Sequence, residues 1–420
     1  MTMGGPAKEG AARGFDCSRC GGRLGLCGEV VCPIIQTVKR RLGDNFASHN
    51  LFGASPPAVF VGTWNYPRVY AGPLVPHRMW RDTRVMDDPV QWLDEGMDRI
   101  ISHRLSLIRS HTPVDVHAAV DPDRRLSSVQ ELAMASQPVD TEVELRTPPR
   151  GGLSFSRRSA PMGPTASLKE LRLAENPQVH PRIDYLTSDR DCRAQVAVKE
   201  LFEDGVSTYQ LTRLLSVGLL GRAKTRRLVP TKWSITAIDD IVGKRLHRQV
   251  LRHPLINEYW VFGYHAVGNS IGLLFLPTPW MFEVLEYWLP STRFSSRREV
   301  VIPSDYELTA GRKTYAKTIE GAYYAARLPV LHHLHTLGKQ AGALVFLEVH
   351  PEWLPLGVWR VREICARALS TVPARFNSLS EAIDDVSKHL TTPISYWTRQ
   401  SKILRYRRVQ KSLLSFITGT

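Results

Sequence analysis

Four cysteines lie close together near the N-terminus, at Cys17, Cys20, Cys27 and Cys32, with the spacing C-x2-C-x6-C-x4-C. A C-x2-C pair in a tight turn lets two thiolates bind one ion, and a second pair nearby completes the tetrahedral set that Zn²⁺ accepts. Four Cys ligands leave no open position for water, so we expect one structural zinc ion per chain that folds a knuckle over residues 17–50. The spacing is tighter than that of the common zinc ribbon, and an iron–sulfur cluster or paired disulfides remain alternatives.

A peptide at the C-terminus has the spacing of a protein-docking motif. Gln410 is followed by an aliphatic residue at Leu413 and an aromatic residue at Phe416, as in peptides that bind the sliding clamp PCNA. One helical turn places Leu413 and Phe416 on the same face, as a plug for a hydrophobic pocket. The last position is Ile417 rather than a second aromatic residue, which we expect to weaken clamp binding without abolishing it. The alternative is that this segment packs on the protein's own core.

Acidic side chains offer one possible catalytic centre. Asp140 alternates with Glu142 and Glu144 along a predicted strand, and the pair Asp239 and Asp240 is predicted near a helix start. Paired carboxylates can hold Mg²⁺ for phosphodiester chemistry if they converge in the fold, as in a metal-dependent nuclease. The structural alternative for Asp239 is a capping box with Thr236, in which the carboxylate stabilises free backbone N–H groups.

A second possible centre is a nucleotide pocket. Its candidate residues are Arg312, Glu320, Tyr323, Tyr324 and Arg327. The aromatic rings would stack a base, the arginines would hold phosphate, and Glu320 would be the catalytic carboxylate, as in the processing of ADP-ribose or another nucleotide. The same spacing is also typical of an amphipathic helix whose aromatic residues pack inward.

Basic side chains are concentrated in two segments without acidic neighbours, and such segments bind phosphates without reading sequence. The residues favoured for DNA contact are Arg222, Lys224, Arg226, Arg227 and Lys232, followed by Arg146, Arg150, Arg157 and Arg158. Trp233 could stack an unpaired base beside the first segment. The alternative is a solvated basic loop.

The amino-acid composition indicates a folded protein, and its net positive charge favours an anionic partner. The chain has 420 residues, of which 43% are hydrophobic and 23% charged, so a collagen-like or wholly disordered chain is excluded. The 55 Lys and Arg residues exceed the 40 Asp and Glu residues, giving a net charge of +15, which favours nucleic acid as a partner. We find neither an uninterrupted apolar stretch that would span a membrane nor a secretory signal, so we expect a cytoplasmic protein without membrane contact.

The pattern of elements predicts a mixed α/β (α+β) fold. We expect a disordered N-terminus at 1–16, the knuckle at 17–50, a central body at 51–390 with an exposed loop at 147–165, and a basic tail at 391–420 that includes the peptide 410–417. Strands are predicted at 64–73, 139–145, 258–267, 270–276 and 342–349. Helices are predicted at 89–110, 191–203, 207–219, 234–252, 280–289, 318–339, 358–369 and 379–390.

The combination of knuckle and terminal peptide resembles the archaeal Nre family of DNA repair proteins. The resemblance extends through the blocks Ser55–Gly62, Pro138–Leu145, Pro161–Thr165, Leu171–Pro177, Leu228–Asp240, Gly311–Lys313, Gly321–Arg327 and Pro355–Glu363. It implies a role in DNA damage repair, recruitment to DNA by PCNA through the tail, and zinc in the knuckle. It implies no particular reaction, and a clamp-associated adaptor without catalysis is a further alternative.

Overall fold

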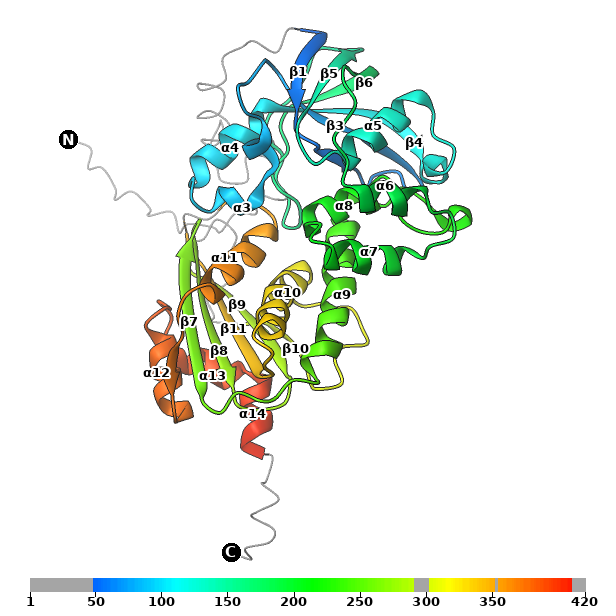
Figure 1. Ribbon diagram of the computed structural model, residues 1–420. Coiled ribbons are helices and arrows are strands. Elements are labelled where there is room, and N and C mark those ends of the chain that lie inside the picture. Colours follow the sequence, from blue (N-terminus) through cyan, green and yellow to red (C-terminus); the bar gives the residue numbers. More distant parts are fainter. Residues whose placement is uncertain (1–47, 291–301, 352–353, 410–420) are drawn as a thin grey trace, which may run out of the picture.

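The computed structural model describes residues 48–290, 302–351 and 354–409, and these residues form two six-stranded sheets with helices around them. Figure 1 shows the two sheets at opposite ends of the molecule, with helices α7, α8 and α9 beside the junction. The predicted mixed α/β class is therefore confirmed. Within the described ranges, no helix is long and apolar enough to cross a membrane. The four cysteines of the predicted knuckle and the terminal peptide lie outside the described residues.

The first sheet contains the N-terminal strands in the order β1-β5-β6-β4-β3-β2. Its strands are β1 (Asn50–Ser55), β2 (Val59–Val61), β3 (Arg68–Pro76), β4 (Leu107–Asp115), β5 (Val139–Leu145) and β6 (Thr165–Leu173). Only β4 and β6 run parallel to each other among these neighbours. Helix α5 (Arg124–Met134) covers one face, where Leu126 and Val129 pack in one buried cluster with residues of β3, β5 and β6.

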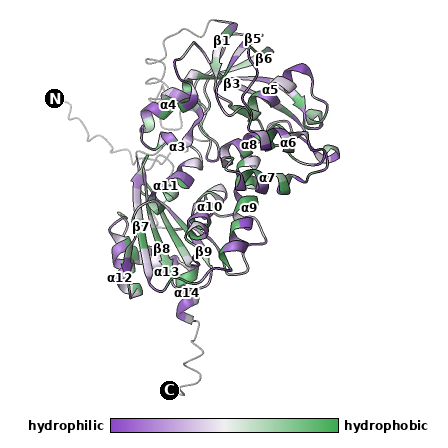
Figure 2. Ribbon diagram, in the orientation of Figure 1, coloured by the Kyte–Doolittle hydropathy of each residue, from purple (hydrophilic) through white to green (hydrophobic). Residues whose placement is uncertain are grey.

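The second sheet has the order β10-β9-β11-β8-β7-β12 and helices on both faces. Its strands are β7 (Tyr259–Ala266), β8 (Asn269–Leu276), β9 (Phe282–Trp288), β10 (Ser304–Glu307), β11 (Gly342–Val349) and β12 (Ala374–Phe376). The helices are α10 (Gly321–Thr336) and α11 (Trp359–Leu369) on one face, and α12 (Leu379–Ser387), α13 (Ile394–Gln400) and α14 (Lys402–Val409) on the other. Because both faces are covered, every residue of β8 and β11 is buried, and both strands are largely apolar (Figure 2).

The remaining helices connect the two sheets. They are α3 (Pro89–Trp92), α4 (Met97–Ser106), α6 (Pro181–Ser188), α7 (Ala194–Glu203), α8 (Thr208–Ser216) and α9 (Thr231–Val250), with short 3₁₀ turns at Arg84–Asp87, Val116–Ala119 and Ala223–Thr225. Helix α9 packs against α7 and α8 on one side and against α10 on the other. It therefore joins the first half of the chain to the second.

Most predicted elements are confirmed, with small shifts at their ends. The strand predicted at 139–145 and the buried strand at 342–349 have the predicted bounds. The helix predicted at 379–390 is α12, and Ser378 caps its first turn through a capping box with Glu381. Helix α10 includes Pro329, as the predicted helix at 318–339 required.

Three predictions are wrong for identifiable reasons. The helix predicted at 89–110 is divided at Gly96, whose φ is +75°, and its last residues belong to strand β4. The helix predicted at 280–289 is strand β9, which pairs with β11 on one side and β10 on the other. The loop predicted as exposed at 147–165 is held by two isolated bridges, Arg150 with Thr165 at the start of β6 and Ser154 with Met162 within the loop, and its Leu153 and Phe155 are buried.

The predicted basic tail begins with folded helices. Trp397 of α13 and Ile403 and Leu404 of α14 are buried in the core beside the second sheet. The carboxylate of Glu283 on β9 accepts hydrogen bonds from Ser401 Oγ at 2.6 Å and from the backbone N–H groups of Lys402 and Ile403 at 2.9 and 3.0 Å. These bonds fix the start of α14, so residues 394–409 belong structurally to the body.

Candidate functional site

The basic segment Gly221–Trp233 runs from the loop after α8 into the first turn of α9, and its cations have different roles. Arg226 donates to the backbone oxygens of Gly221, Thr187 and Asp189, so its guanidinium holds the shape of the segment. Arg222 donates more weakly to Asp191 O, at 3.3 Å. Lys224 and Arg227 are exposed, and in the described part of the chain no carboxylate lies within ion-pair distance of either. These two are therefore available to an external phosphate.

Other predicted DNA-contact residues lie around the first turn of α9. Lys232 is half-buried, and burial together with the nearby Arg158 and Arg109 lowers the pKa of its amine. Arg158 forms a 2.6 Å ion pair with Glu320, and Arg157 lies 5.9 Å from the ring centre of Trp288. The predicted basic residues therefore come together only in part. Arg158 lies near Lys232 at the first turn of α9, Arg157 lies over Trp288 of β9, and Lys224 and Arg227 lie earlier in the basic segment.

The proposed catalytic carboxylates have separate partners. Asp239 is buried within α9 and accepts from Arg362 Nη2 at 2.7 and 2.6 Å, and Asp240 pairs with Lys244 at 2.6 Å. Glu320 pairs with Arg158, and Asp140 lies on β5 in the first sheet. Across residues 48–290, 302–351 and 354–409, no group of three or more His, Cys, Asp or Glu side chains is arranged to hold a metal ion.

The predicted capping box at Thr236 is wrong. Helix α9 begins at Thr231, so Thr236 and Asp239 lie inside it. The Asp239 side chain turns towards α11 because Arg362 reaches it there. Burial raises the pKa of Asp239, and the Arg362 guanidinium opposes that rise. Asp239 thus joins two helices rather than capping one.

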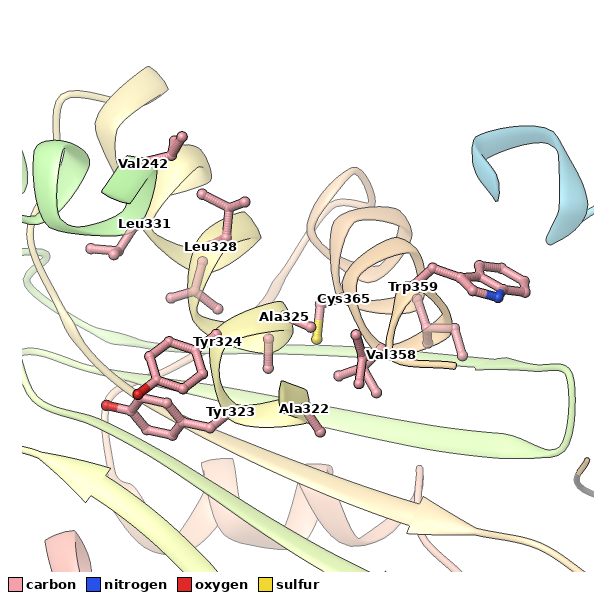
Figure 3. Close-up of a cluster of buried hydrophobic side chains, with 14 of the residues drawn as sticks. Val242, Ala322, Tyr323, Tyr324, Ala325, Leu328, Leu331, Val358, Trp359 and Cys365 are labelled. Atoms are coloured by element: carbon pink, nitrogen blue, oxygen red, sulfur yellow. The ribbon is translucent and has the colours of Figure 1, made fainter. Parts of the chain in front are cut away.

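Four of the five residues proposed for a nucleotide pocket lie together, but a different glutamate supplies the carboxylate. Arg312, Tyr323, Tyr324 and Arg327 line a single cavity of about 240 Å³, with Asp240 also in its wall. Figure 3 shows the rings of Tyr323 and Tyr324 side by side at one end of α10, pointing away from Trp359 and α11. Glu320 is not part of this cavity. The carboxylate at its base is Glu307, from strand β10.

Glu307 organises the pocket by accepting three hydrogen bonds. Its Oε1 accepts from Arg327 Nε and from Trp280 Nε1, both at 2.7 Å, and its Oε2 accepts from the backbone N–H of Arg312 at 2.9 Å. Burial, and then the Glu307 charge, raise the pKa of Tyr323. Both oxygens of Glu307 are occupied, so this geometry favours ligand binding over acid–base chemistry by Glu307 itself.

Two further features shape the same pocket. A Cβ at Gly243 would lie 2.7 Å from Arg327 Nη1, so glycine at this position of α9 leaves room for the guanidinium. His247 Nε2 has no hydrogen-bond partner among the described residues, and burial, then Arg327, lower the pKa of this histidine. The wall of the pocket holds four basic and two acidic side chains, namely Lys244, Arg312, Lys313 and Arg327 against Asp240 and Glu307. The pocket therefore suits an anionic ligand.

Sequence reasoning missed Glu307, Asp305 and His247. Asp305 accepts from the backbone N–H groups of Thr318 and Ile319 and pairs with Arg312 at 2.9 Å. The alternation of Asp305 and Glu307 in a short strand was the available signal, because alternate residues of a strand share a face. Their partners lie up to 27 residues away in the chain and could not be assigned from spacing.

The two cysteines that the structure describes differ from the predicted knuckle residues. Cys365 is buried in α11, and burial, followed by the charge of Glu363, raises the pKa of its thiol. Cys192 is partly buried, and its pKa is also raised, first by burial and then by Asp189. A raised pKa disfavours the thiolate that a metal requires. Both residues therefore suit packing rather than metal binding.

Comparison with known proteins gives consistent matches along the chain. The family model described as "Archaeal Nre, N-terminal" matches residues 26–295, and "Archaeal Nre, C-terminal" matches residues 307–416. "DNA repair protein NreB" of Archaeoglobus fulgidus is 32% identical over 96% of this chain and 100% of its own length. "DNA repair protein NreA" of the same organism is 36% identical over 89% of this chain and 93% of its own length.

A third relative extends the comparison to another archaeon. "DNA repair protein NreA" of Haloferax volcanii is 33% identical over 87% of this chain and 89% of its own length. No solved structure matches the chain. The predicted resemblance is confirmed by two family models and by relatives that align along most of their length, and the chain therefore belongs to the archaeal Nre family.

Proposed function

We propose that this protein acts in DNA repair and that the sliding clamp PCNA recruits it to DNA through the C-terminal peptide. The similarity along most of the chain to proteins named for DNA repair carries the first part of the proposal. The second part rests on the sequence of the peptide and on its position. Helix α14 is anchored by Glu283 and ends at Val409, immediately before Gln410. The peptide therefore follows directly on a helix that Glu283 fixes to the body.

Binding of the full-length protein to the clamp of the same organism tests this recruitment. Leu413 and Phe416 are the expected anchors. Phe416→Ala should weaken binding at least tenfold, because a buried aromatic anchor commonly contributes about 2 kcal/mol to the free energy of binding. Leu414→Ala is the matched control, since Leu414 occupies a variable position of the same peptide. Equal affinity of Phe416→Ala and the unmodified protein, measured by calorimetry, would refute recruitment through this peptide.

We also propose a structural role for zinc at Cys17, Cys20, Cys27 and Cys32. Four thiolates within 16 residues supply a complete tetrahedral donor set, and two of them share a C-x2-C turn. The other two cysteines of the chain, Cys192 and Cys365, have raised pKa values and suit packing better than metal binding. Zinc would stabilise the fold of the N-terminal segment and would leave no coordination position for catalysis.

The pocket at Glu307 supports nucleotide binding as a second candidate function. Its basic residues would hold phosphate, and the stacked rings of Tyr315 and Tyr324, 5.5 Å apart, offer a surface for a base. Calorimetry with ADP-ribose and with inorganic phosphate tests this function. Lys313 lines the pocket and is exposed, so Lys313→Ala should weaken binding several-fold, whereas Lys317→Ala, outside the pocket, should leave it unchanged. If neither ADP-ribose nor inorganic phosphate binds, this candidate function is wrong.

A further inference from the structure

Three large aromatic side chains lie exposed at the junction of the first sheet and α9. Trp64 is 71% exposed, Tyr66 is 43% exposed and Trp233 is 44% exposed. We call Trp64, Tyr66 and Trp233 the aromatic platform. Aromatic rings contribute most when they are buried, so a group of them on the surface indicates a binding site for another molecule.

A ring contact and a hydrogen bond hold the two parts of the platform together. Trp64 and Tyr66 come from the loop between β2 and β3, and Trp233 comes from the first turn of α9. The rings of Tyr66 and Trp233 are 5.3 Å apart and tilted by 53°. The hydroxyl of Thr231 accepts from the backbone N–H of Val61 at 2.9 Å, which fastens the start of α9 to β2.

The loop that carries Trp64 is itself braced. The backbone N–H of Gly62 donates to Tyr70 O at 2.8 Å, and that of Arg68 donates to Asn65 O at 2.9 Å. One face of the Trp64 ring stacks on Tyr70, with centroids 5.9 Å apart and planes within 14°. With 71% of the side chain exposed, the opposite face remains open to a planar ligand. The platform is therefore preorganised, which lowers the entropic cost of binding.

The basic segment Gly221–Trp233 is fastened to the same loop. The backbone N–H of Val116 donates to Pro67 O at 3.0 Å, and that of Leu228 donates to Val116 O at 2.8 Å. Arg227 therefore lies next to the point where Val116 joins the basic segment to the loop between β2 and β3, and Lys232 directly precedes Trp233. Arg68 faces Asp115 across β3 and β4, so Arg227 and Lys232, rather than Arg68, are the cations assigned to the platform.

We infer that the aromatic platform binds unpaired bases of single-stranded DNA while Arg227 and Lys232 contact its phosphates. Every base has a flat face that can stack on an aromatic ring, and cations beside the rings match the charge of the backbone. In a duplex the base faces are covered by neighbouring pairs, so stacking would select unpaired strands. This inference rests on the proposed role in DNA repair and deepens it, because it specifies which form of DNA the body would engage.

Fluorescence anisotropy with full-length protein and labelled DNA tests the inference. The probes are a single strand of about 12 nucleotides, within the usual range for such sites, and the duplex of the same sequence. Trp64→Ala and Trp233→Ala should each raise the Kd for the single strand about tenfold. Trp64→Phe should retain most of the affinity, because a ring remains. Neither Ala variant should change the Kd for the duplex by more than about twofold.

Matched controls separate stacking from charge and from damage to the fold. Tyr306, on β10 of the other sheet, is also 43% exposed, and Tyr306→Ala should leave both affinities unchanged. Arg227→Ala and Lys232→Ala should weaken binding of both probes, and each should reduce the salt dependence by about one phosphate contact. Thermal unfolding of each variant confirms that the body is intact.

The outcomes distinguish this inference from the proposed function. Tight single-strand binding that Trp64→Ala and Trp233→Ala leave unchanged would overturn the platform while the repair role stands. Failure of the unmodified protein to bind either probe would overturn the platform and direct DNA contact together. Recruitment by PCNA would still be tested separately, by clamp binding and its loss in Phe416→Ala.

Discussion

Arg362 Nη2 lies 2.7 and 2.6 Å from the two carboxylate oxygens of Asp239, and this buried ion pair joins α11 to α9. Removing one member leaves the other charge buried without a partner, which typically costs about 3–5 kcal/mol. We therefore expect Asp239→Leu and Arg362→Met each to lower the free energy of unfolding by about that amount. Denaturant unfolding measures the loss.

Two further variants test whether the cost arises from the unpaired charge. The double variant Asp239→Leu with Arg362→Met should lose less stability than the two single losses combined, because it removes both charges together. Asp240 forms an ion pair with Lys244 on a partly exposed side of the same helix. Asp240→Ala should therefore cost less than about 1 kcal/mol. Additive losses in the double variant would contradict a coupled pair.

Glu283 offers a second test, at the start of α14. Its buried carboxylate accepts from Ser401 Oγ and from the backbone N–H groups of Lys402 and Ile403. Glu283→Ala leaves these donors without a partner, and we expect a loss of about 2–4 kcal/mol in the free energy of unfolding. Amide hydrogen exchange at residues 402 and 403 should accelerate. Ser401→Ala removes only one donor and should lower the free energy of unfolding by less. Amide exchange at residues 402 and 403 that stays slow in Glu283→Ala would contradict the anchoring role.

Elements with a strong local pattern could be predicted from the sequence. The alternation of Val139–Leu145 and the largely apolar run of Gly342–Val349 each predicted a strand with correct bounds. The capping box of Ser378 and Glu381 at the start of α12 is likewise complete within four residues of the chain. In each case the information that determines the element lies within the element itself.

Elements whose polar residues have distant partners could not be predicted in this way. In Phe282–Trp288, Glu283 and Glu286 have the spacing of a polar helix face, yet the segment is strand β9 and both side chains have long-range partners. Asp239 fitted a capping box locally, whereas its partner Arg362 lies 123 residues further along the chain. The same limit applies to the aromatic platform, since Trp233 was recognised and its neighbour Tyr66 was not.

His333 provides a prediction about pH. Burial on α10 against Phe262 and Phe275, and then the neighbouring His332, lower the pKa of His333 to about 4. The unfolded chain, in which a histidine has a pKa near 6.5, binds the proton more readily, so stability should fall as the pH decreases from about 6.5 to about 4. Because the side chain is only partly buried, we expect this histidine to contribute about 2 kcal/mol to that fall.

The measurement compares urea unfolding at pH 7 and pH 5 for the unmodified protein and for His333→Phe. The substituted ring preserves the aromatic contacts and cannot bind a proton, so the difference in stability between the two pH values should decrease. His332 is exposed, and His332→Phe should leave most of the pH dependence in place. An unchanged pH dependence in His333→Phe would show that other histidines, such as His247, account for it.

The metal content of the protein tests the knuckle proposed at Cys17, Cys20, Cys27 and Cys32. Elemental analysis of the purified protein should find about one zinc ion per chain, and Cys17→Ser should lose it because a hydroxyl is a poor zinc ligand. Cys192→Ser is the matched control, since Cys192 is partly exposed but lies far along the chain on the turn before α7. This variant should retain zinc and stability. Iron with acid-labile sulfide in place of zinc would favour a cluster at the same four residues, and full zinc content in Cys17→Ser would refute the knuckle as the metal site.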